Sequence, residues 1–186
     1  MQDIITLDHG SGGLKTSQLI DEILVPAFAN TALADLGDAA IVPGGGPLVF
    51  STDSFVVTPW RFPGGDIGKL AVCGTVNDLC MAGGDPKYLS CALILEEGFP
   101  LDDLRAVAAS MAAAAREAGV QIVTGDTKVV ARGQGDGVYI NTAGVGVLRT
   151  PGLGRAGLRE GDAVLISGSA GCHGAAVLMA RGGLPG

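Results

Sequence analysis

Residues 88–124 read YLSCALILEEGFPLDDLRAVAASMAAAAREAGVQIVT, and this stretch decides the fold class. It opens with a continuous apolar run, which predicts a buried strand at 88–95. The alanine-rich middle has apolar residues at the spacing of one helix face, so we expect a helix over 101–118 that ends at Gly119. The apolar residues that follow predict a second strand at 120–124.

The flanking sequence extends this core in both directions. Segments rich in β-formers predict more strands, and Asp66 is a natural N-cap for a second long helix. The order of strands and helices is mixed rather than strictly alternating, which is typical of an α+β fold with helices on one side of a sheet. The additional expected elements are strands at 39–42, 48–57 and 138–148 and helices at 14–29 and between Asp66 and Gly83.

The two ends of the chain differ from this core. Residues 1–13 are polar and glycine-rich, so we expect a mobile lead-in with nothing to pack into a core. Residues 151–161 are rich in turn formers, and beyond them we expect a strand at 163–168 and a helix at 175–181. We therefore divide the chain into a glycine-rich segment with a helix at 1–30, a main domain at 31–150, and a linker with the incomplete start of another domain at 151–186.

The composition excludes several classes of protein. The 186 residues carry a net charge of −7 and no cluster of Lys or Arg, so nucleic-acid binding is not expected. The sequence has no apolar run of bilayer-spanning length and no signal-peptide pattern, so we expect a soluble cytoplasmic protein. No CxxC pair occurs, and the four cysteines are expected to be small buried thiols: Cys73, Cys80, Cys91 and Cys172.

Four aspartates lie in apolar surroundings, where an unpaired carboxylate is costly to bury. Magnesium prefers carboxylate oxygens, water and phosphate as ligands, so a hard cation is one explanation. Helix or turn capping is the other explanation, and the residues alone leave both open. The four are Asp38, Asp53, Asp78 and Asp126, of which Asp126 is expected directly after the strand at 120–124.

Two glycine-rich segments could approach phosphate groups. Residues 9–13, HGSGG, precede an expected helix whose free amides could hold an anion. Residues 64–70, GGDIGKL, are not a Walker motif, because the spacing is short and Leu70 stands where a Ser or Thr would be needed. Lys128 could neutralise a phosphate, and neither His9 nor His173 belongs to a nucleophile motif, which argues against a triad hydrolase.

Six motifs taken together are much more specific than any one of them. They are HGSGG at 9–13, STDSFVV at 51–57, FPGGDIGKLAVCGTVNDL at 62–79, LILEEGFP at 93–100, TGDTKVV at 124–130 and INTAGVG at 140–146. This combination resembles the HypE family of nickel–iron hydrogenase maturation proteins, and more distantly the superfamily of AIR synthetase, selenophosphate synthetase and thiamine-monophosphate kinase. The resemblance implies an AIR-synthetase-like N-terminal domain and a homodimer whose sheets join into a barrel-like core.

The resemblance also implies a site for ATP and magnesium. Magnesium would lie among Asp38, Asp53, Asp78 and Asp126, and Lys128 would be the catalytic cation. The nucleotide would contact Gly10, Ser11, Gly12, Gly13, Asn77, Thr127 and Lys128. The implied reaction is the ATP-dependent dehydration of a C-terminal cysteine S-carboxamide to a thiocyanate, the source of the iron cyanide ligand. The implied partners are the carbamoyltransferase HypF and the HypC–HypD scaffold complex.

Two departures from the family pattern bear on activity. The family's C-terminal Pro-Arg-Ile-Cys tail is absent here, so no cysteine can be assigned as the carbamoyl carrier. The family's Gly-Asp-His-Gly motif reads Gly171-Cys172-His173-Gly174. We therefore expect ATP binding without turnover by this chain alone. The alternatives are a non-catalytic dimerisation or docking fragment, and a small-molecule kinase of the same superfamily, against which the EEGFP and FPGG segments argue.

Overall fold

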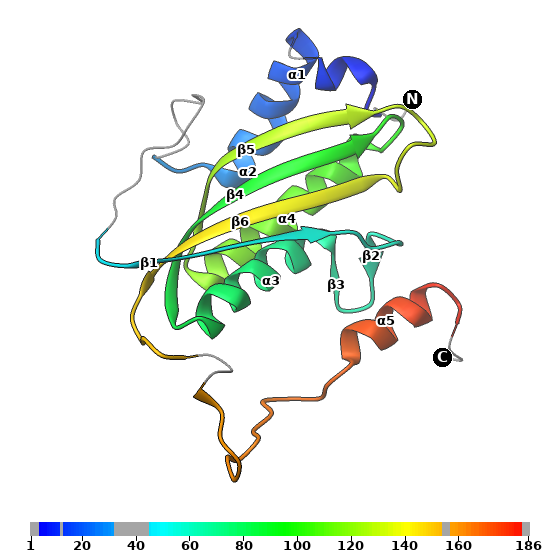
Figure 1. The fold of residues 1–186 in the computed structure, drawn as a ribbon. Helices are drawn as coiled ribbons and strands as arrows, with labels where there is room; N and C mark the ends of the chain where they lie inside the picture. Colours follow the sequence, from blue (N-terminus) through cyan, green and yellow to red (C-terminus); the bar gives the residue numbers. More distant parts are fainter. Residues whose placement is uncertain (1–3, 12, 32–44, 154–156, 184–186) are drawn as a thin grey trace.

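A four-stranded mixed sheet forms the centre of the molecule (Figure 1). The computed structural model describes residues 4–11, 13–31, 45–153 and 157–183. The strand order is β1 (Leu48–Phe55), β6 (Val138–Leu148), β4 (Gly84–Glu96) and β5 (Gln121–Val130). β6 is antiparallel to both of its neighbours, whereas β4 and β5 are parallel. The strands expected at 48–57, 88–95, 120–124 and 138–148 are confirmed, and the one expected at 39–42 lies outside the described residues.

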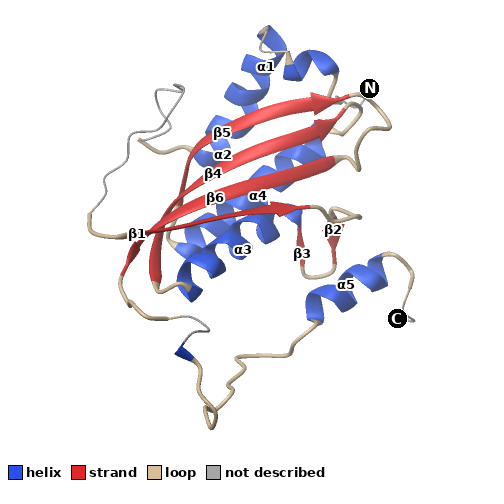
Figure 2. Ribbon diagram, in the orientation of Figure 1, coloured by secondary structure: helices blue, strands red, loops and turns tan. Residues whose placement is uncertain are grey.

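Two long helices, α3 (Ile67–Met81) and α4 (Leu101–Ala118), cover one face of this sheet (Figure 2). Every second residue of β6 is buried, as the two-residue period of a strand with one covered face requires. The predicted N-cap is confirmed, since the Asp66 carboxylate accepts a hydrogen bond from the Lys69 N–H at 2.9 Å. Gly119 follows α4 in a left-handed conformation with a φ of 68°. The α+β class is confirmed.

A helical stretch from Leu14 to Phe28 lies beside α4. It consists of α1 (Leu14–Leu19), a π-helical turn at Ile20–Leu24 and α2 (Val25–Phe28). Pro26 has no N–H, and its ring clashes with the carbonyl four residues earlier in a regular α-helix, so the helix widens at this point. The helix expected at 14–29 is confirmed, with this local irregularity.

The residues before α1 are packed against the domain. The Ile5 side chain is fully buried, its N–H donates to the Phe99 carbonyl at 2.7 Å, and its carbonyl accepts from the Gly98 N–H at 2.7 Å. A 3₁₀ turn follows at Leu7–Gly10. The expectation that nothing in residues 1–13 packs into a core is wrong, because the turn after β4 supplies main-chain partners that no local pattern reveals.

β5 is longer than the sequence pattern predicts. Gly125, Asp126 and Lys128 lie inside it and continue the pairing with β4. A Cβ at Gly125 would lie 2.4 Å from the Cys91 carbonyl oxygen, so glycine is what lets the two strands continue side by side. The expectation that Asp126 comes after the strand is therefore wrong.

The C-terminal part reaches back to the domain through α5 (Cys172–Ala180). The His173 ring meets the Phe62 ring edge to face at a centroid distance of 5.2 Å. Phe62 belongs to a short hairpin made by β2 (Arg61–Phe62) and β3 (Gly65–Asp66). The helix expected at 175–181 is confirmed and begins a few residues earlier.

Residues 163–168 do not form the expected strand. Val164 and Leu165 are 96% and 92% exposed, and the segment is irregular. A strand needs a partner for its N–H and carbonyl groups, and none of the described strands pairs with this segment. The prediction is wrong because an apolar run specifies a strand only together with a neighbour.

The four thiols have different environments. Cys91 is buried, and burial raises the pKa of its thiol to about 12. Cys73 is half-buried, and burial raises its pKa as well. Cys80 and Cys172 are exposed, so the expectation of buried thiols is wrong for these two. Within the described ranges, none of the helices combines the length and the apolar character that crossing a bilayer requires.

Candidate functional site

β1 and α3 bring two of the predicted metal-binding aspartates together. Ser51 and Asp53 point from the same face of β1, because they are two residues apart on a strand. The Ser51 hydroxyl donates to the Asp78 carboxylate at 3.0 Å. A Cβ at Gly74, one helical turn before Asp78, would lie 3.7 Å from the Asp53 Oδ2. Both carboxylates therefore lie along the line where β1 meets α3.

The spacing of the two elements explains this arrangement. Two residues of a strand advance about 6.6 Å and four residues of an α-helix advance about 6 Å, so each of Ser51 and Asp53 faces one turn of α3. Gly74 keeps the strand close to the helix, since a Cβ there would lie 2.7 Å from the Phe55 ring. Ser51 was not among the predicted site residues, although its two-residue spacing from Asp53 was a usable signal.

The two carboxylates retain free oxygens. The Asp53 Oδ1 accepts from the Ser54 N–H at 2.8 Å and the Asp78 Oδ2 accepts from Ser51, while the other two oxygens receive no hydrogen bond from the described residues. Magnesium is usually held by one or two carboxylates, with water and phosphate oxygens completing the octahedron. The donor set at β1 and α3 fits that requirement. The predicted nucleotide residue Asn77 is exposed beside Asp78.

Asp126 and Lys128 form a second polar pair on β5. The Lys128 ammonium lies 2.8 Å from the Asp126 Oδ1, and this hydrogen bond holds the pKa of Asp126 below its ordinary value. Both side chains are exposed. Their strand positions pair with the residues of β4 that face away from α3 and α4, whereas Thr127 between them is buried on the helix side.

The two pairs are far apart within one chain. β1 and β5 are opposite edges of the sheet, three strand spacings or about 14 Å apart. Asp126 also points from the opposite face, so the structure brings Asp53 to Asp78 and leaves Asp126 away from both. Asp38 lies outside the described residues. No three side chains of His, Cys, Asp or Glu gather into a metal site in the part of the chain that the structure describes.

The HGSGG segment lies against β5. A Cβ at Gly10 would come within 2.7 Å of the Val129 N, so the main chain of the 3₁₀ turn sits directly on the strand that carries Lys128. The Ser11 hydroxyl donates to the Asp8 carbonyl at 2.9 Å. Gly13 is the N-cap of α1, and Gly12 lies outside the described residues. The HGSGG segment therefore lies next to the strand that carries Lys128, the predicted phosphate-binding cation.

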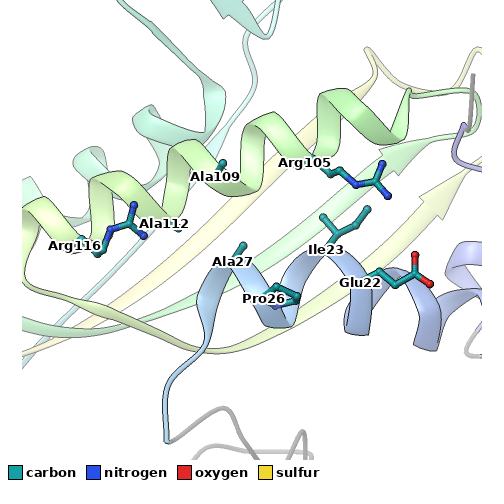
Figure 3. Close-up of a pocket in the computed structure, with 8 residues that line it drawn as sticks. All are labelled: Glu22, Ile23, Pro26, Ala27, Arg105, Ala109, Ala112 and Arg116. Atoms are coloured by element: carbon teal, nitrogen blue, oxygen red, sulfur yellow. The ribbon is translucent and has the colours of Figure 1, made fainter.

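A groove of about 320 Å³ lies elsewhere, between the π-helical turn with α2 on one side and α4 on the other (Figure 3). Its lining residues are Glu22, Ile23, Pro26, Ala27, Arg105, Ala109, Ala112 and Arg116. None of the predicted site residues is among them, so we do not assign the nucleotide to this groove. We place the site at β1 and α3 instead, because the carboxylates there are the ligands that magnesium prefers.

Comparison with known proteins gives the family of the chain. Residues 36–148 match the model of the AIR synthase related protein, N-terminal domain. The carbamoyl dehydratase HypE of Cupriavidus necator is 55% identical over 180 residues, which are 95% of this chain and 51% of that protein. The chain spans about half the length of the curated relatives it matches.

Solved structures show the same relationship. A HypE crystallised in complex with ATP is 54% identical and superposes with a TM-score of 0.92, covering 96% of this chain and 54% of that one. A HypE–HypF complex contains a chain that is 50% identical, with a TM-score of 0.69, covering 90% of this chain and 55% of that one. The fold, the family match and these relatives together show that the chain belongs to the AIR synthase related family, with the HypE carbamoyl dehydratases as its relatives.

Proposed function

We propose that the chain is the ATP-binding part of a HypE-type carbamoyl dehydratase that serves hydrogenase maturation. The placement of Asp53 and Asp78 along the line where β1 meets α3 carries this proposal, because magnesium bound to a nucleotide is usually held by one or two carboxylates together with phosphate oxygens and water. The ATP complex of a relative with 54% identity supports the choice of nucleotide. Gly10, Ser11, Gly12 and Gly13 cover the phosphates in this proposal, and Asn77 lines the nucleotide. The Thr127 side chain is buried on the helix side of β5, so of the predicted nucleotide residues it contributes its main chain only.

The reaction removes water from the S-carboxamide of a C-terminal cysteine. The amide oxygen takes the γ-phosphoryl group of ATP, with release of ADP and one amide proton. Loss of phosphate and the second proton then leaves the thiocyanate. Asp53 and Asp78 would hold a magnesium ion, which would neutralise charge on the triphosphate. Lys128 donates to the phosphate as its negative charge develops.

A second copy of the chain supplies the other half of the site in this proposal. The sheet face away from the helices carries exposed apolar side chains, with Leu48 59% and Phe50 67% exposed on β1. Covering that face with another copy favours a homodimer. In such a dimer Asp126 and Lys128 of one copy lie at the interface, and this proposal has them approach Asp53 of the other copy around the edge of the described sheet that β1 forms. Within one chain the two pairs stay apart.

The remaining roles follow from the relatives and from the family resemblance. HypF is a proposed partner because a related HypE was crystallised with it. The HypC–HypD scaffold is proposed from the resemblance alone. Residues 1–30 and 31–150 then form the nucleotide-binding part, and residues 151–186 lead toward the part that carries the carbamoylated cysteine.

Calorimetry with magnesium and ATP tests the site directly. We expect binding by the unaltered chain and a loss of about tenfold or more in Asp53→Asn and Asp78→Asn. Asp102→Asn is the matched control, because Asp102 is an exposed aspartate on α4. Binding that is insensitive to both site substitutions contradicts the metal assignment. No binding at all favours the docking-fragment alternative, and phosphate release with a carbamoylated tail peptide contradicts the expectation that the chain is inactive alone.

Mixing two variants tests the two-copy site. Asp53→Asn and Asp126→Asn chains, unfolded together and refolded, form heterodimers in which one site carries both substitutions and the other carries neither. We expect about a quarter of the high-affinity ATP sites to return if chains pair at random. A site built within one chain returns none.

A further inference from the structure

We infer that Asn141 and Thr142 of β6 are positioning residues that set the placement of Asp53 relative to Asp78. The inference rests on the proposed magnesium site and concerns two side chains that neither the sequence motifs nor the relatives assign to it. Asp53 lies on β1 and Asp78 lies on α3, so their separation depends on how these two elements are fixed to a common base. β6 is that base, since it pairs with β1 and lies under α3.

Asn141 holds β1 from the face of the sheet opposite to the helices. Its Nδ2 lies 3.0 Å from the Asp53 carbonyl oxygen, 2.9 Å from the Ser54 Oγ and 3.3 Å from the Thr52 Oγ1. These contacts come on top of the regular pairing of β1 with β6. Among the described strands β1 is at the edge of the sheet, and edge strands have partners on one side only. Asn141 thus fixes β1 to β6 at Asp53, the residue whose carboxylate would bind the metal.

Thr142 holds α3 from the other face. It is fully buried, its hydroxyl donates to the Ala71 carbonyl at 2.9 Å, and the Thr75 hydroxyl lies 2.6 Å away. Because the one Thr142 hydrogen goes to Ala71, Thr75 is the donor in the second hydrogen bond. Thr75 is also fully buried and lies three residues before Asp78. The pair therefore fixes the position of α3 along β6 one turn away from the carboxylate.

Packing alone does not require a residue that forms hydrogen bonds at position 142. Ile140 and Val138 occupy the equivalent helix-facing positions of β6, and both are 1% exposed. A valine at position 142 would fill the same space as threonine, but it would let α3 slide, because apolar contact has no preferred direction. Adjacent residues of a strand point to opposite faces, so Asn141 and Thr142 together reach the two elements that carry the carboxylates.

The test measures Mn²⁺ affinity by electron paramagnetic resonance in the presence of ATP, together with ATP affinity in EDTA and the melting temperature. We expect Asn141→Ala and Thr142→Val to weaken Mn²⁺ binding by about tenfold or more, as loss of a group that orients a metal ligand does. ATP affinity in EDTA should stay unchanged. Thr142→Ser keeps the hydroxyl and should keep the Mn²⁺ affinity. Ile140→Val is the control for lost packing and should lower the melting temperature without changing Mn²⁺ affinity.

The outcomes separate this inference from the proposed function. Wild-type Mn²⁺ affinity in folded Asn141→Ala and Thr142→Val, alongside a loss in Asp53→Asn, overturns the inference and leaves the site assignment standing. Unchanged Mn²⁺ affinity in Asp53→Asn overturns the proposed site and the inference with it. If Thr142→Val does not fold, Asn141→Ala decides alone, because Asn141 is outside the hydrophobic core of the chain. Asn141 is on the face that the proposed dimer covers, so the comparison uses Asn141→Ala at the wild-type oligomeric state, as light scattering measures it.

Discussion

Replacing Gly10 by alanine tests whether the HGSGG segment is held against β5. A Cβ at Gly10 would lie 2.7 Å from the Val129 N and 2.9 Å from the Val129 Cβ. Carbon atoms in contact are normally about 3.5–4.0 Å apart, so the 3₁₀ turn or the strand must move by roughly 1 Å. Overpacking of this kind costs about 1–3 kcal/mol, and we expect urea denaturation to show a loss of that size.

Gly13→Ala is the matched control within the same motif. The nearest atom to a Cβ at Gly13 is the Ser11 Oγ at 3.5 Å, and its φ of −94° suits any residue, so no overpacking is expected. Gly13 is the N-cap of α1, where alanine is less favourable than glycine, so we expect a loss of about 0.5 kcal/mol. Amide hydrogen exchange gives a local readout. The amides of Ile5 and Gly98, which join this segment to the turn after β4, should exchange faster in Gly10→Ala and not in Gly13→Ala. Equal unfolding free energies and exchange rates for the two variants would refute the reasoning.

Three further predictions concern the core, the charges and the thiols. Leu104→Ala, at a fully buried position of α4, should lower the free energy of unfolding by about 2–5 kcal/mol in urea denaturation. Carboxyl NMR titration should find the pKa of Asp126 below its usual value and closer to that value in Lys128→Ala. Because the folded-state pKa is the lower one, the stability from this pair is present above the unfolded-state pKa and is lost as the pH falls through the folded value. A thiol reagent should modify Cys80 in the folded protein and Cys91 only after unfolding, which mass spectrometry can follow.

The helices could be predicted because their signals are local. The bounds of α4 follow from the apolar spacing within it and from Gly119 after it, and α3 begins where Asp66 can accept from Lys69. Such signals act within one or two turns of the chain, so a sequence pattern contains all of the information. The same holds for the alternation in β6, where the covered face is marked by every second residue.

Features that depend on distant partners could not be predicted in this way. Ile5 is buried because residues 98 and 99 offer it hydrogen bonds, and Val164 is exposed because no described strand lies beside it. In both cases the local sequence is misleading: a polar lead-in contains a core residue, and an apolar run does not form a strand. For Ile5 the deciding contact is with a segment far away in the sequence. For Val164 none of the described strands supplies such a contact.

A β-bulge in β5 decides from which face of the sheet Asp126 points. Strict alternation from the buried Ile122 would place Asp126 on the helix side of the sheet, the side on which Asp53 and Asp78 lie. The register with β4 shifts by one residue, since Leu89 pairs with Ile122 but Ser90 pairs with Thr124. A shift of one residue moves every later side chain to the opposite face, which puts Asp126 and Lys128 on the face that α3 and α4 leave uncovered. A second copy can approach this face. The bulge in β5 is therefore the local feature that places Asp126 and Lys128 where they could belong to a site shared between two chains.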